Sequence, residues 1–144
     1  MAIEVQVTVD CADPDGTARF WVQALGYEVE GPPEGYPTWE DYMQAIGLPK
    51  EEWDSGASIV DPDGRGPRIF FQRVPEGKVV KNRLHLDLGV GGGHQTPLEV
   101  RRERVDAEAA RLAGIGAARL HANEEGGWYG VVMQDPEGNE FCLH

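Results

Sequence analysis

Two stretches of the chain are approximate copies of one another, and this internal repeat restricts the fold more than any single residue. The first copy opens with "VQVTVDCADPDGTARFWVQALGYEV" and closes with "DPDGRGPRIFFQRV". The second copy opens with "LHLDLGV", continues through "EVRRERVDAEAARLAGIGA" and closes with "DPEGNEFCLH". Each copy is typical of a strand, a helix and further strands joined by an Asp-Pro-acid-Gly turn. A duplicated βαβββ unit predicts an α+β fold in which two half-sheets surround one concavity.

Length and charge narrow the classes of protein that this chain can represent. Its 144 residues are enough for one compact domain with a sizeable core. A net charge of −12 repels nucleic acid phosphates and anionic membranes, so we expect neither as a main partner. Two cysteines, Cys11 and Cys142, form no disulfide framework. Because no basic leader or long apolar run occurs either, we predict a soluble cytoplasmic protein.

The repeat divides the predicted single domain, residues 1–144, into two modules. The first module covers 1–74 and contains an insertion at 31–56. A polar connection at 75–83 leads to the second module at 84–144.

Capping residues and hydrophobic periodicity predict the elements of each module. Asp13 as N-cap and Pro14 at the first position begin the first helix, which Gly26 ends. Thr96 as N-cap and Glu99 at N3 form the capping box of the second helix, which buries Val105, Ala109 and Leu112. The predicted strands cover residues 3–10, 27–30, 58–61, 68–74, 84–88, 118–121, 128–134 and 140–143.

The insertion combines several prolines with most of the aromatic residues of the first module. An insertion of this length inside a compact domain is more often a functional lid than a plain linker. Its tryptophans could equally hold the insertion against the body by burial, and the two interpretations stay open here. The aromatic residues are Tyr36, Trp39, Tyr42 and Trp53.

The segment "GVGGGHQ" resembles a phosphate-binding loop only superficially. His94 occupies the place of the last glycine in the G-x-G-x-x-G pattern. We therefore interpret it as a flexible loop before the second helix.

Alternation along the strands predicts which side chains face away from the helices. In "LHLDL" the leucines share the helix-covered face, so His85 and Asp87 share the other. Polar residues on the concave face of a curved sheet are typical of a ligand-holding cup. The same alternation assigns to that face Gln6, Thr8, Phe70, Gln72, Glu140, Cys142 and His144.

The motifs "DCADPDGTARFWVQALGYE", "FFQRVPEGKVVKNRLHLDL" and "DPEGNEFC" follow one another in this order. Together they resemble the vicinal oxygen chelate superfamily, also called the glyoxalase/bleomycin-resistance/dioxygenase superfamily. Within it, the chain is most similar to glyoxalase-like proteins common in actinobacteria. The resemblance implies paired βαβββ modules that form a U-shaped, cup-like curved mixed sheet with helices on the outer face.

The metal-dependent members of this superfamily take four ligands from the first and fourth strands of their two modules. The first-strand positions correspond to Gln6 and His85 in this chain. The final-strand position corresponds to Cys142, where those enzymes have Glu. Its counterpart in the first module is Phe70, or Gln72 if the longer turn shifts the register.

This set of side chains departs from what a hard divalent cation prefers, which is carboxylate and imidazole. His85 and Cys142 could bind zinc, with Asp87 or His144 as further ligands. Otherwise His85 is a histidine hydrogen-bonded to Asp87 or to a backbone carbonyl, and Cys142 is a small buried apolar residue. We expect no resident metal, and we keep a divalent metal such as zinc, held by His85, Cys142 and Gln6, as the alternative.

Two classes of function remain. The first is a metal-independent protein that binds a small aromatic molecule in the cup between the modules, and the resemblance implies that it is a homodimer. The second is a glyoxalase-like lyase or dioxygenase-type enzyme that uses a divalent metal or His85 as a base oriented by Asp87. The predicted ligand-binding residues are Gln6, Thr8, Trp39, Trp53, Phe70, Gln72, His85, Asp87, Trp128 and Cys142.

Overall fold

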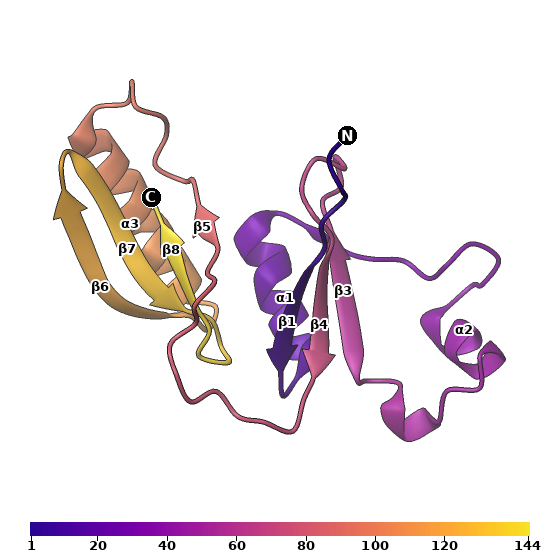
Figure 1. Ribbon diagram of the computed structural model, residues 1–144. Coiled ribbons are helices and arrows are strands. Elements are labelled where there is room, and N and C mark those ends of the chain that lie inside the picture. The colour runs from indigo at the N-terminus through magenta and orange to yellow at the C-terminus, as the bar shows by residue number, and fades with distance from the viewer. The chain divides into compact units, whose positions relative to one another are not determined.

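A computed structural model describes residues 1–144, and the chain divides into two compact units. Unit 1 is Met1–Gly77 and unit 2 is Lys78–His144, so the division falls inside the predicted connection (Figure 1). None of the helices is both long and apolar enough to cross a membrane.

Unit 1 contains a mixed sheet of four strands in the order β1-β4-β3-β2. The first and last strands pair in parallel, whereas β3 is antiparallel to both β4 and β2. Its elements are β1 (Val7–Cys11), α1 (Pro14–Leu25), β2 (Glu28–Val29), α2 (Trp39–Ala45), the 3-10 helix η1 (Lys50–Glu52), β3 (Gly56–Val60) and β4 (Ile69–Arg73).

Unit 2 repeats this topology, with a four-stranded sheet in the order β5-β8-β7-β6. Again the first and last strands pair in parallel and the remaining neighbours pair antiparallel. The sequence repeat is therefore confirmed as a repeat of βαβββ topology in an α+β fold. The elements of unit 2 are β5 (Asp87–Leu88), α3 (Leu98–Ala113), β6 (Ala118–Glu125), β7 (Trp128–Gln134) and β8 (Glu140–Leu143).

The capping prediction is confirmed for α1 and wrong for α3. The Asp13 side chain accepts a hydrogen bond from the Gly16 N–H at 3.1 Å, and Gly26 ends the helix in the left-handed region at φ 69°. In α3 the N-cap is Pro97 rather than Thr96, and no side chain caps the helix. The reason is that Pro97 has an extended backbone, with ψ 145°, so the helix begins one residue later than predicted.

The predicted alternation of buried and exposed side chains holds along β4 and β7, whereas every residue of β6 is exposed. Ile69 and Phe71 are buried in β4, as are Phe141 and Leu143 in β8. The three residues that were predicted to form the buried face of α3 are buried, namely Val105, Ala109 and Leu112.

Leu84 and Val5 are exceptions to this pattern, because they are 91% and 67% exposed rather than buried. The predicted strand at 3–10 starts too early, since β1 begins only at Val7. The predicted strand at 84–88 is wrong at its start: β5 contains only Asp87 and Leu88. Leu84 therefore lies before the ladder and outside the core.

The Asp-Pro-acid-Gly turns have the same internal construction in both units. The Asp61 carboxylate accepts hydrogen bonds from the N–H groups of Asp63 and Gly66, each at 2.8 Å. These backbone hydrogen bonds lower the pKa of Asp61. In the second turn Asp135 accepts from the N–H groups of Glu137 and Asn139, each at 2.9 Å. The turn is thus part of the repeat and precedes the last strand of each sheet.

Candidate ligand-binding site

We call the sheet face turned away from α1 or α3 the open face of each unit. In unit 1 the register pairs Thr8 with Phe70 and Asp10 with Gln72. Thr8 and Gln72 are exposed on this face, as is Gln6, whose Nε2 donates to the Thr8 hydroxyl at 3.4 Å. Four predicted site residues of unit 1 therefore lie on its first and last strands or just before them.

Phe70 lies against the backbone of β3 at Gly56. A Cβ atom at position 56 would be 2.7 Å from Cζ of the Phe70 ring, so the glycine leaves room for this ring. The guanidinium of Arg68 lies 5.7 Å from the ring centroid, which is a cation–π distance. An aromatic ring that is fixed in this way and partly exposed is a surface on which a planar ligand can stack.

Arg68 also connects the open face to the end of β2. Its Nε and Nη2 donate to the two carboxylate oxygens of Glu30, both at 2.8 Å. Its Nη1 donates to the side-chain oxygen of Gln6 at 2.6 Å, and Ser58 donates to Glu30 at 3.1 Å. The Arg68 hydrogen bonds are the main cause of the lowered pKa of Glu30. The amide oxygen of Gln6 is therefore already engaged by a cation.

Replacing Glu30 by Gln is expected to lower the free energy of unfolding at pH 7 by about 1 kcal/mol. A carboxylate whose pKa is lowered in the folded state stabilises the protein at pH values above the pKa that it has in the unfolded chain, here 4.5. This contribution is lost as the pH falls through the lower folded value, so the difference between wild type and Glu30→Gln should shrink at acidic pH. Urea unfolding at pH 7 and at pH 3 measures both differences.

Asp63→Asn is the matched control, because Asp63 pairs with Arg65 at 2.9 Å where the two side chains are 66% and 82% exposed. We expect no measurable change in unfolding free energy for this variant. A Glu30→Gln effect that stays the same at both pH values would contradict the role assigned to the Arg68 pair.

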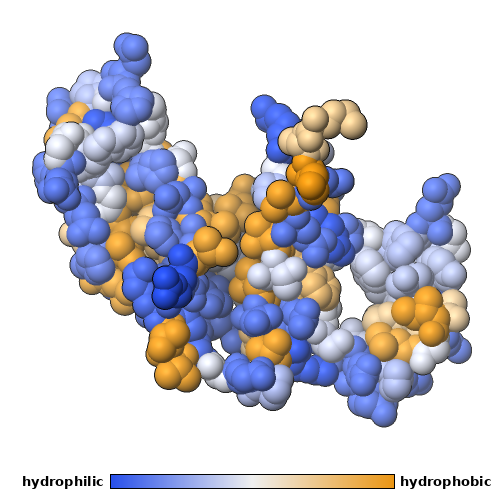
Figure 2. Space-filling view, in the orientation of Figure 1, coloured by the Kyte–Doolittle hydropathy of each residue, from blue (hydrophilic) through white to orange (hydrophobic).

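The insertion keeps its aromatic residues mainly in contact with one another. Trp39 and Tyr36 both lie edge-on to Tyr42, with ring centroids 6.0 and 5.1 Å apart. The Trp39 indole donates to the Glu30 carbonyl at 2.8 Å, and the Trp53 indole donates to the Leu48 carbonyl at 2.9 Å. No residue of α2 is buried, and Figure 2 shows hydrophobic surface on this segment. The tryptophans thus organise the insertion itself, and none of their hydrogen bonds or ring contacts is made with Phe70 or Gln6.

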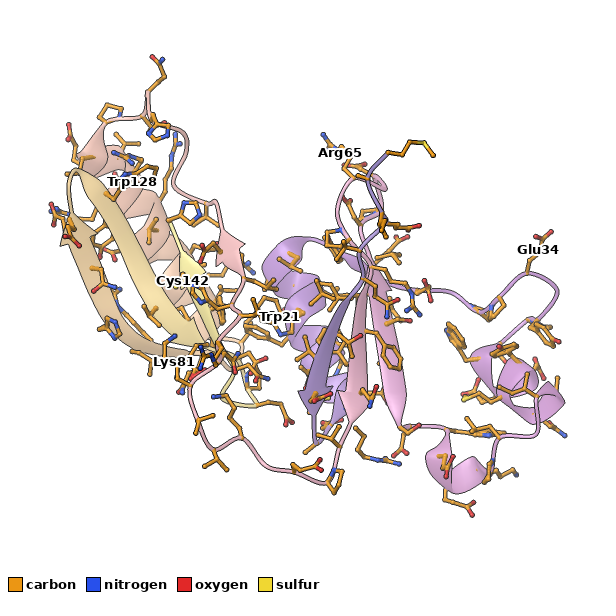
Figure 3. The ribbon with its side chains drawn as sticks, viewed as in Figure 1. Trp21, Glu34, Arg65, Lys81, Trp128 and Cys142 are labelled. Carbon is orange, nitrogen blue, oxygen red and sulfur yellow. The ribbon has the colours of Figure 1, made fainter.

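In unit 2, three predicted site residues come together on the open face. The ligating atoms of His85, Asp87 and Cys142 all lie within 4.8 Å of one another. His85 Nε2 is 3.4 Å from Asp87 Oδ1, and the register pairs Asp87 directly with Cys142. Figure 3 shows Cys142 on β8 of this sheet. Nitrogen, oxygen and sulfur donors are therefore available at one point of this sheet.

Burial raises the pKa of the Cys142 thiol, and the negative charge of Asp87 raises it further. The nearby Lys81 acts in the opposite direction with a smaller effect. Cys142 is consequently a thiol at neutral pH and not an activated thiolate nucleophile.

Trp128 lies on the same open face, at the start of β7 (Figure 3). Its ring centroid is 6.4 Å from that of His144, which follows Cys142 by two residues. His144 is held in place, because its N–H donates to the Leu88 carbonyl and its oxygen accepts from the N–H groups of Val90 and Gly91. A row of polar and aromatic side chains therefore runs along β8 toward Trp128.

The donors of the two units differ in how well they suit a metal ion. His85, Asp87 and Cys142 fit a borderline-soft ion such as zinc, which accepts imidazole, carboxylate and thiolate ligands. Unit 1 has no comparable set, since Gln6 is bound by Arg68 and Phe70 pairs with Thr8 at the fourth-strand position. A bound zinc ion would supply a Lewis acid next to His85. These residues do not offer the carboxylate-rich site that a hard cation requires.

Residues 6–144 match the family model described as a glyoxalase-like domain, so the chain belongs to this family. None of the curated proteins that were compared with the sequence matches it.

Solved structures show the same fold at low sequence identity. A glyoxalase/bleomycin resistance protein/dioxygenase family enzyme from Burkholderia phytofirmans has a TM-score of 0.62 at 18% identity, covering 96% of this chain and 94% of its own. A mutant of the fosfomycin resistance protein FosX from Listeria monocytogenes was solved in complex with Mn(II) and 1S,2S-dihydroxypropylphosphonic acid. It has a TM-score of 0.63 at 12% identity, covering 100% of this chain and 90% of its own. The bleomycin-binding protein from Streptomyces verticillus, complexed with copper(II)-bleomycin, has a TM-score of 0.54 at 15% identity, covering 99% of this chain and 95% of its own.

The sequence patterns did not predict two groups of contacts, those of Arg68 with Phe70 and those around Trp128. Arg68 precedes Phe70 by two residues, so strand alternation could have placed it on the open face. Arg101 and His94 contact Trp128 from a helix and a loop, and no periodic pattern reports such contacts.

Proposed function

We propose that this glyoxalase-like protein binds a small aromatic molecule on the open faces of its sheets and needs no metal to do so. The observation that carries the proposal is the composition of these faces. Each combines polar side chains with an accessible aromatic ring, Phe70 in unit 1 and Trp128 in unit 2. The Streptomyces verticillus protein, which is described as bleomycin-binding, supports binding as a function of this fold.

The residues of the two faces have different proposed roles. Phe70 stacks on the ligand, and the exposed side chains of Thr8 and Gln72 provide hydrogen bonds. On the open face of unit 2, Asp87 and His85 orient polar groups of a molecule bound to that face, with Cys142 beside them. Trp39 and Trp53 belong to the insertion, for which we propose a lid role.

Phe70→Ala is expected to weaken binding of a planar aromatic ligand by about two- to tenfold, because one stacking contact contributes roughly 0.5–1.5 kcal/mol. Isothermal titration calorimetry with bleomycin and a panel of naphthalene derivatives measures the dissociation constants. Trp39→Ala and Trp53→Ala in the same titration measure the contribution of the insertion.

Val29→Ala is the control for these variants, since Val29 is an exposed apolar residue on β2, at the opposite edge of the sheet from β1. Its dissociation constants should equal those of the wild type. Unchanged affinity in Phe70→Ala for every ligand that binds would reject the stacking role, and absence of binding across the panel would reject the proposed function.

A second candidate function is a zinc-dependent enzyme of the glyoxalase-like type. The specific observation in its favour is the cluster of His85, Asp87 and Cys142, whose donor atoms lie within 4.8 Å of one another. In this alternative the three side chains hold the ion, and His85 and Asp87 no longer act as an acid–base pair.

We also propose that the protein is a cytoplasmic homodimer. The acidic composition supports solubility, and neither cysteine forms a disulfide, which suits a reducing compartment. Light scattering coupled to size-exclusion chromatography measures the mass in solution.

A further inference from the structure

Trp128 differs from the tryptophans of the insertion in how its indole is used. Trp39 and Trp53 both donate their indole N–H to a backbone carbonyl. Trp128 is 45% exposed, and no protein acceptor lies within hydrogen-bond distance of its indole N–H. A large aromatic side chain that is exposed and has an unused donor is available to a ligand.

Three basic side chains surround the Trp128 ring, and each comes from a different element of unit 2. The His94 ring, from the glycine-rich loop, is edge-to-face with it at 4.8 Å, and the His144 ring, after β8, is at 6.4 Å. The guanidinium of Arg101, in α3, lies 5.3 Å from the ring centroid. Arg101 is held there because its Nη2 donates to the Gly127 carbonyl at 2.9 Å.

No carboxylate neutralises the charge of Arg101. Its Nε has no hydrogen-bond partner, and it forms none of the salt bridges of unit 2. The next residue along α3 is different, since Arg102 pairs with Glu124 at 2.5 Å. Arg104, one turn away from Arg101, donates to the Gly91 carbonyl at 3.3 Å. The surroundings of Trp128 are therefore locally basic in a chain with a net charge of −12.

We infer that Trp128, Arg101, His94 and His144 form a binding site for a planar aromatic anion of the carboxylate class. The inference rests on the proposed function and adds to it the charge of the ligand. The aromatic part stacks on the exposed indole, and the carboxylate accepts hydrogen bonds from Arg101 and from imidazole N–H groups.

The net negative charge of the chain does not prevent anion binding at this place. At physiological ionic strength charges are screened beyond about 8 Å, so the side chains that touch the ligand dominate its electrostatic energy. Overall charge alone would favour a cationic guest, and the groups around Trp128 favour the opposite sign.

The test compares three ligands that differ in charge but share one ring system: 2-naphthoate, 2-naphthalenemethanol and 2-naphthylmethylammonium. Calorimetry measures affinity, and the indole N–H signal in ¹⁵N-labelled protein, assigned with Trp128→Phe, reports the place of binding. We expect 2-naphthoate to bind at least about tenfold more tightly than the alcohol, since a charge-assisted hydrogen bond contributes about 1.5–3 kcal/mol. The ammonium compound should bind most weakly.

Arg101→Gln should abolish the preference for the carboxylate, whereas Arg102→Gln, which alters the arginine already paired with Glu124, should leave it unchanged. Melting temperatures of both variants separate a binding effect from a loss of structure. Equal affinity for the three ligands, or binding that leaves the Trp128 signal unmoved, overturns this inference and leaves the proposed function intact. If none of the three ligands nor any other aromatic compound of the panel binds, the inference and the proposed function both fail.

Discussion

Phe71→Ala is expected to lower the free energy of unfolding by about 3–5 kcal/mol, the largest stability effect that we foresee for one residue of unit 1. Phe71 is 0% exposed, lies in β4 on the face that packs on α1, and neighbours Ile69 on the same face. Truncation removes the transfer free energy of the ring and leaves a cavity that the surrounding strands cannot fill completely. Urea unfolding followed by circular dichroism measures the difference.

Phe70 provides the matched comparison, since it is the same residue type one position earlier on the opposite face. Phe70→Ala should lower the unfolding free energy by only about 1 kcal/mol, corresponding to its partial burial and its contact with Arg68. If Phe71→Ala does not fold, Phe71→Leu is used instead. It should lower the free energy of unfolding by about 1–2 kcal/mol, which still shows that position 71 contributes more to stability than position 70. Equal losses at the two positions would contradict the assignment of the buried and open faces.

The second large effect concerns zinc. If the alternative function holds, Cys142→Ser should lower zinc affinity by about 100-fold or more, because a hydroxyl is a poor substitute for a soft thiolate ligand. Calorimetric titration of chelator-treated protein with zinc chloride measures the affinity of wild type and variant.

His144→Gln is the control, because His144 lies two residues beyond Cys142 but is not part of the His85, Asp87 and Cys142 cluster. Its zinc affinity should match the wild type. Wild-type protein that binds no zinc removes the enzyme alternative and favours the metal-independent proposal. A loss of equal size in His144→Gln would show that the ion is held by other side chains.

Strand alternation and the internal repeat predicted most of the fold. Both depend on local periodicity, which one sequence displays directly, and the helix-side residues Ile69, Phe71, Phe141 and Leu143 are buried as predicted. The boundaries were less predictable. Leu84 continues an alternating pattern by sequence, yet β5 pairs with β8 only from Asp87 onward.

The candidate site was predictable only where it follows a strand. His85, Asp87 and Cys142 were placed on one face by alternation, and the structure brings them together. The contacts of Arg101 and His94 with Trp128 depend on how the first turn of α3 and the glycine-rich loop before it lie beside the β6–β7 hairpin, and local pattern does not report this. The hydrogen bonds of Trp39 and Trp53 within the insertion were likewise outside the reach of periodicity.

The placement of the insertion has a consequence for how this protein can diversify. The parallel pair of β1 and β4 closes a chain loop that contains the whole insertion, and α2 within it buries no residue. Loop-closure entropy changes by only about 0.6 kcal/mol when the length of a loop is halved or doubled. Evolution can therefore lengthen, shorten or rewrite the segment beside the first sheet at little thermodynamic cost, while the repeated framework that carries Phe70 stays the same.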